Sequence, residues 1–167
     1  MPVAPEREVE VFRVHFATLL VSILAALLLQ TVLPILIPVA SLMDFPLLVV
    51  VYFTLIRQNQ IFGIALGAGL GLVQDALSHG YLGMFGMAKA LAGYLAGSAA
   101  MRFNFESLLT RSVVTASLVL IHNLCMAGLQ RFLLEPPPPF LPLDLASAVL
   151  VNVALSLILF PILDRFR

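Results

Sequence analysis

The sequence predicts an all-α integral membrane protein, a bundle of about six transmembrane helices, and composition and length carry this prediction. Hydrophobic residues make up 61% of the 167-residue chain and charged residues only 11%, against roughly 45–50% and 25% in an average soluble domain. A membrane-spanning helix needs about 20 mostly apolar residues. Six such helices fit this length with short loops, which leaves no room for a separate soluble domain.

The chain is expected to divide into a polar N-terminal lead, one membrane domain and a short polar tail. These parts cover residues 1–14, 15–164 and 165–167. Apolar runs separated by polar, glycine-rich or proline-rich breaks predict six helices. They are expected at about 15–37, 45–56, 61–77, 82–100, 112–134 and 143–163.

The first two expected helices are joined through prolines. Pro34 and Pro38 are expected to end or kink the first helix, because each lacks a backbone donor. The second run, from Pro46 to Arg57, is too short for a full span. It is therefore expected to begin with a broken or re-entrant segment, with Asp44 near the outer interface.

The third and fourth helices are expected to form a tight hairpin, because residues 61–97 hold nine of the ten glycines. Small residues four apart leave a helix face without side chains, so that a neighbouring backbone can approach closely. The expected packing faces carry Gly63, Gly67 and Gly71 on one helix, widened by Gly69, and Gly86, Gly93 and Gly97 on the other.

Residues 101–111 are expected to form a polar connection to the fifth helix, and four consecutive prolines precede the sixth. Such a proline run favours extended polyproline II rather than helix. The run begins at Pro136, so it predicts a separate connection between two membrane-spanning segments.

Arginine placement predicts the orientation, since cytoplasmic loops are enriched in Lys and Arg. With six spans, one side of the membrane collects Arg7, Arg13, Arg57, Arg102, Arg111, Arg165 and Arg167, and the other side collects only Arg131. Both termini are therefore expected in the cytoplasm. The formal net charge of zero offers no basic face for nucleic acid.

Several polar residues fall inside the expected membrane segments, where a charge costs roughly 2.5–3.5 kcal/mol on insertion scales. Asp75 and Lys89 flank the turn of the glycine-rich hairpin at similar depth, so they could pair across it; alternatively, Lys89 snorkels outward and Asp75 lies at the membrane edge. In one interpretation these two residues have a structural role, and in the other they belong to a partner or ligand site. His122, Asn123 and Asn152 are expected to act as interhelical hydrogen-bonding residues, with Asn152 bonding to either of the other two.

No pattern in the sequence indicates catalysis, a cofactor or a metal site. Its three histidines, at positions 15, 79 and 122, are expected at different depths. The run Gly67–Gly71 has the composition of a phosphate loop, but it lies inside an apolar helix with no strand before it, so a nucleotide site is excluded by context.

The hairpin sequence resembles the rod shape-determining MreD family. The resemblance is carried by GAGLGLVQDALSHGYLG (Gly67–Gly83), MFGMAKALAGYLAG (Met84–Gly97) and, upstream, DFPLLVVVY (Asp44–Tyr52). It implies a non-enzymatic scaffold subunit of the bacterial cell-elongation complex that binds MreC and supports peptidoglycan synthesis. MreB, the glycosyltransferase RodA with its transpeptidase, and membrane lipid would be the wider partners.

The same family is similar in fold to the substrate-binding S components of energy-coupling-factor vitamin transporters, which provides an alternative function. S components usually carry an Ala-xxx-Ala patch on the first helix for docking the transport partner. Here Ala17, Ala25 and Ala26 each lack an alanine four residues later, which counts against the transporter interpretation.

Overall fold

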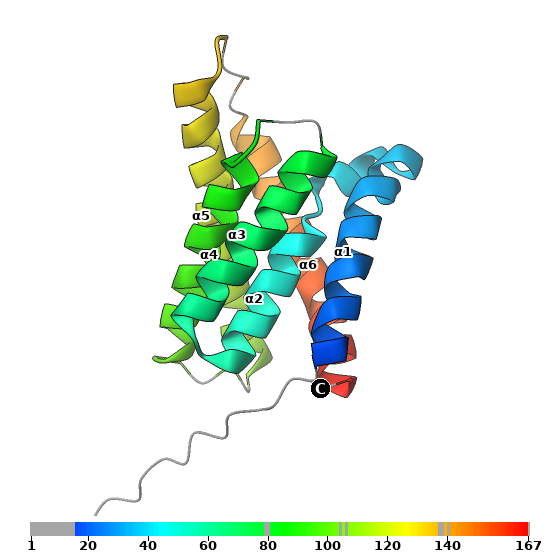
Figure 1. The fold of residues 1–167 in the computed structure, drawn as a ribbon, viewed down its shortest axis with the longest axis vertical. Coiled ribbons are helices and arrows are strands. Elements are labelled where there is room, and N and C mark those ends of the chain that lie inside the picture. The colour runs from blue at the N-terminus through cyan, green and yellow to red at the C-terminus, as the bar shows by residue number, and fades with distance from the viewer. Residues whose placement is uncertain are drawn as a thin grey trace, which may run out of the picture.

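The computed structural model describes residues 16–78, 81–103, 105, 107–136, 139 and 141–166. Within them the chain forms six α-helices and one short 3-10 helix, η1, arranged side by side (Figure 1). Their bounds are α1 Phe16–Leu36, η1 Pro38–Leu42, α2 Phe45–Arg57, α3 Gln60–Leu77, α4 Met84–Ala100, α5 Leu108–Leu133 and α6 Pro142–Arg165. The predicted lead and the end of the tail, residues 1–15 and Arg167, lie outside the described residues.

The all-helical fold class is confirmed, and the structure refines several boundaries. Four helices, α1, α3, α5 and α6, are long and apolar enough to cross a membrane; that all six helices span it stays a prediction. α5 begins at Leu108, so the end of the expected polar connection forms its first turn. α4 begins at Met84 because Gly83 adopts a left-handed φ of 98°, which favours glycine.

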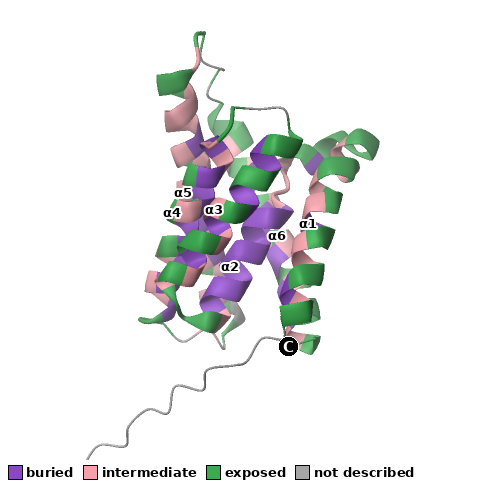
Figure 2. Ribbon diagram, in the orientation of Figure 1, coloured by how far each residue is buried: buried purple, intermediate pink, exposed green. Residues whose placement is uncertain are grey.

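α2 is the central helix of the bundle, although it has only 13 residues. Every residue from Phe45 to Leu55 is buried, and Figure 2 shows this helix almost wholly in the buried colour. Large apolar side chains on α1, α3, α5 and α6 are instead exposed, as expected of surfaces that face lipid. The short central helix therefore forms the core, and longer helices surround it.

The chain breaks before α2, as predicted, and side chains from two other helices hold the break. The Gln30 side chain donates to the Met43 carbonyl (3.1 Å) and accepts from the Phe45 amide (3.0 Å). Asn152 donates to the Leu42 carbonyl and accepts from the Asp44 amide, both at 2.8 Å. Backbone without helical bonding is tolerated at membrane depth only where such partners exist.

At the opposite end of the bundle, an ionic network joins three helices. The Arg111 guanidinium of α5 lies 2.6 Å from an Asp164 carboxylate oxygen of α6, and the Tyr52 hydroxyl of α2 donates to the other oxygen at 2.9 Å. We call this the terminal end of the bundle, because α1 begins and α6 finishes there (Figure 1). The other end, which carries η1, is called the η1 end.

Close backbone contact joins α3 and α4, and the glycines allow it. A Cβ atom added to Gly63 or Gly67 would overlap the backbone of Gly93 or Lys89, and one added to Gly71 would overlap Gly86. Gly97 lies against the backbone of Gln60 in the same way. Gly69 does not widen this face as expected: it is exposed, and an added Cβ would meet no atom within 4 Å.

We predict that Gly67→Leu destabilises the bundle, because the new side chain must push the α4 backbone away. Gly69→Leu is the matched control, since it adds the same side chain two residues away into open space. Thermal unfolding of the two purified variants in detergent measures the difference. Equal unfolding temperatures would show that the close contact is dispensable.

Candidate functional site

The candidate site is a buried cluster of one aspartate, one lysine and one histidine, which three helices bring together. The Lys89 ammonium of α4 lies 2.6 Å from an Asp44 carboxylate oxygen, at the start of α2. The Nε2 atom of His122, on α5, is 3.5 Å from the Lys89 nitrogen and 3.8 Å from the same Asp44 oxygen. The Lys89 side chain is fully buried and that of Asp44 is 14% exposed.

Asp44 holds its position because it also caps α2. Its second carboxylate oxygen accepts from the Leu47 amide at 3.0 Å, and Pro46 follows within the first turn. An acidic N-cap with proline in the first turn is a favoured helix start. The break before α2 therefore brings a carboxylate below the η1 end, where it meets the ammonium of α4.

The expected pair between Asp75 and Lys89 is wrong: Lys89 pairs with Asp44 instead. Asp75, 1% exposed, accepts from the backbone amides of Gly83 (2.9 Å), Phe85 (3.1 Å) and Gly86 (3.2 Å). It thus caps α4 from the neighbouring helix, because Gly83 has no side chain with which to do so. Asp75 and Lys89 both lie in the α3–α4 hairpin, but Asp75 bonds to backbone amides and Lys89 bonds to Asp44.

The expected bond between Asn152 and the α5 pair is also not formed. Asn152 binds the break before α2 and the Ala148 carbonyl of its own helix. Asn123 donates to the Val119 carbonyl within α5 at 2.8 Å. Of the five polar residues predicted from the sequence, only Lys89 and His122 belong to the cluster with Asp44, and His79 and His15 lie outside the described residues.

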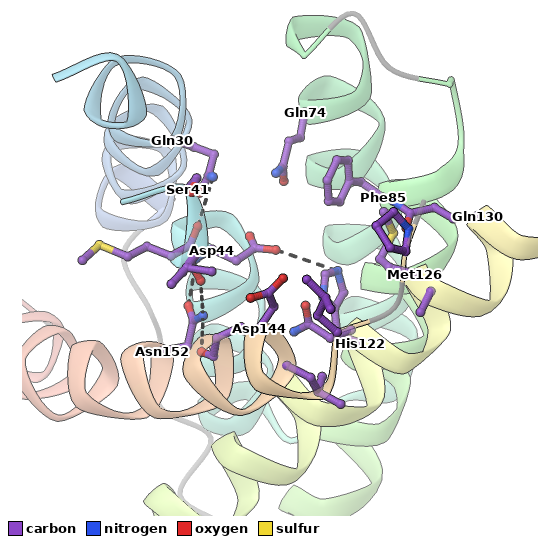
Figure 3. A pocket seen from close by; sticks show the side chains of 18 residues that line it. Gln30, Ser41, Asp44, Gln74, Phe85, His122, Met126, Gln130, Asp144 and Asn152 are labelled. Atoms are coloured by element: carbon purple, nitrogen blue, oxygen red, sulfur yellow. Dashed lines mark hydrogen bonds and ion pairs between the residues drawn. The ribbon is translucent and has the colours of Figure 1, made fainter. Parts of the chain in front are cut away.

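Above the cluster lies a polar cavity of about 320 Å³ (Figure 3). Residues of η1, Pro139 and Leu141 contribute to its walls, which places it at the η1 end of the bundle. Asp44 and His122 line it, as do the polar side chains Gln30, Ser41, Gln74, Gln130, Asp144 and Asn152. Its volume is at the lower end of the range for small-molecule sites, about 300–1,000 Å³.

Asp44, Gln30 and Gln74 belong to this site although they were not predicted from the sequence to do so. A signal for Asp44 was present, since Asp-Phe-Pro ahead of an apolar run marks a helix start that carries a charge into the membrane. The two glutamines have no comparable pattern. Among the described residues, no group of three His, Cys, Asp or Glu side chains lies close enough to hold a metal ion.

Fold and site together define a helical membrane protein whose core contains a buried ion pair below a polar cavity. The family model described as rod shape-determining protein MreD matches residues 11–166, nearly the whole chain, and the chain belongs to this family. It is thus a membrane protein that determines rod shape and is associated with the rod-shape complex. Searches of curated proteins and of solved structures found no match.

We predict that Lys89→Met destabilises the protein by about 3–5 kcal/mol, because removing one partner leaves the other as an uncompensated charge in the interior. The double variant Asp44→Asn with Lys89→Met is expected to recover part of this loss. Arg102→Met, which removes an exposed cation just after α4, is the control. Thermal unfolding in detergent is the measurement, and a double variant no more stable than Lys89→Met would contradict the pairing.

We predict that Asp75→Ala lowers the free energy of unfolding by roughly 2–4 kcal/mol, because three backbone donors lose a charged acceptor. Glu135→Gln, which changes an exposed carboxylate, serves as the control. Hydrogen exchange at the start of α4 gives a local readout. Unchanged exchange of the Gly83 and Gly86 amides in Asp75→Ala would rule out the capping role.

Proposed function

We propose that this protein is a non-enzymatic scaffold subunit of the bacterial cell-elongation complex, which binds MreC and supports peptidoglycan synthesis. The observation that carries the proposal is the family match over residues 11–166. MreB, RodA and its transpeptidase are the proposed partners in the wider complex. The buried α2 core provides such a scaffold with a rigid centre, while the apolar outer helices remain available to lipid and to partner helices.

The proposed location is the inner membrane, with both termini in the cytoplasm. Support comes from the described arginines: Arg57, Arg102, Arg111 and Arg165 all lie at or next to helix ends at the terminal end of the bundle (Figure 1). Arg131 lies in the last turn of α5, at the η1 end. Positive residues gather on the cytoplasmic side of membrane proteins. The polar cavity lies at the opposite end of the bundle and would therefore be on the outer side of the membrane.

A second candidate is a substrate-binding subunit of a small-molecule transporter, similar to an S component. The polar cavity above the Asp44–Lys89 pair favours it, since a scaffold needs no such space. α1 argues against it, because that helix lacks the Ala-xxx-Ala docking pattern.

One pull-down distinguishes the two candidates. The tagged full-length chain is purified from its native membrane in mild detergent, and the retained proteins are identified by mass spectrometry. We predict recovery of MreC and cell-wall synthases with the native chain and with Gly69→Leu, and reduced recovery with Gly67→Leu, whose packing is disturbed.

Two other results would count against the scaffold. Recovery of an ATPase module and a transmembrane coupling protein in place of MreC would favour the transporter subunit. Recovery of MreC at the level of an untagged control would contradict binding of that partner.

A further inference from the structure

Several hydrogen-bond donors that line the polar cavity at the η1 end already bond to the protein. The Gln30 amide nitrogen and the Asn152 amide nitrogen both donate to backbone carbonyls of the break before α2. The Asn123 amide nitrogen donates to Val119. The amides that open α2 are bound as well, those of Phe45 and Leu47 by side-chain oxygens. The start of this helix is therefore not an open anion site.

Acceptors without a hydrogen-bond partner also line the cavity. The buried amide oxygen of Gln74, a residue only 6% exposed, has no hydrogen-bond partner within the described residues, and neither has the buried Nδ1 atom of His122. Such a buried unpaired group is costly and calls for a partner. The Asn123 amide oxygen and the exposed Asp144 carboxylate also line the cavity. Figure 3 shows Gln74, Asp44, Asp144 and His122 around one hollow.

The net charge of the groups at the cavity favours a cationic ligand. Asp44 and Asp144 contribute two carboxylates to the walls, and Lys89, below Asp44, supplies one ammonium. One negative charge remains uncompensated among these three groups. A ligand that donates hydrogen bonds and carries a positive charge matches both the free acceptors and this excess, and charge-assisted bonds of this kind are among the stronger ones.

We propose that this cavity binds the protonated primary amine of a small polar molecule, with Asp144 and Gln74 as acceptors and with Asp44, which is paired with the buried Lys89, at its floor. Two sources carry this chemistry, a soluble amine and an ethanolamine lipid headgroup. Either would approach from the η1 end, where η1, Pro139 and Leu141 contribute to the walls. This inference does not depend on which partner proteins the chain assembles with, because partner recovery and amine binding are measured separately.

The test uses the purified full-length chain in detergent, with ethanolamine as the probe and ethylene glycol as the neutral control of similar size. We expect ethanolamine to raise the unfolding temperature in a saturable way at constant ionic strength, and ethylene glycol not to do so. Asp144→Asn should weaken the apparent affinity about tenfold, the loss expected for one charged hydrogen bond. Glu135→Gln removes a carboxylate that is not among the cavity residues and should bind normally.

Gln74→Met is a second variant, which removes the buried acceptor without removing charge, and it too should weaken binding. Equal responses to the two probes, or full ethanolamine affinity in both Asp144→Asn and Gln74→Met, would overturn the proposal. Nanodiscs separate the two sources. Native mass spectrometry that retains phosphatidylethanolamine over phosphatidylglycerol, with loss of this preference in Asp144→Asn, assigns the headgroup. Saturable ethanolamine binding without lipid preference assigns the soluble amine.

Discussion

The fold depends on the ion pair between Asp44 and Lys89, because each charge would be costly to bury without the other. Lys89 is fully buried, and its partner lies 2.6 Å away at the start of the central helix. Removing a single member of such a pair is usually far more damaging than replacing both. The pair therefore links the position of α4 to the position at which α2 begins, and hence to the break in the chain before it.

The break before α2 also contains buried polar groups that need partners, and here the partners are uncharged side chains. Backbone groups that leave helical bonding inside a membrane need partners from the protein. Gln30 from α1 and Asn152 from α6 supply them on either side of Asp44. Because these side chains bond to the backbone, their amide nitrogens are not available to the cavity above them. The way in which the central helix is held therefore limits which polar groups the cavity can offer.

Much of this architecture could be predicted from the sequence, and the main error concerned which groups the buried charges contact. The spacing of Gly63, Gly67 and Gly71 predicted a smooth face on α3, and α4 lies against those glycines. Asp75 and Lys89 were expected to pair because they are near one another in the hairpin. The structure instead gives Asp75 three backbone amides and gives Lys89 a carboxylate 45 residues away. Nearness in sequence identifies local neighbours but not which of several polar groups a buried charge will reach.

The sequence by itself determined the class of protein, the helices and the break before α2. Length, apolar content and the behaviour of proline and glycine act locally, so they can be read without coordinates. Only the tertiary structure decided that Asp44, Lys89 and His122 meet, and that a polar cavity lies above them. These contacts join residues from three helices, and the packing of α2, α4 and α5 sets their geometry. No pattern within a single helix contains that information.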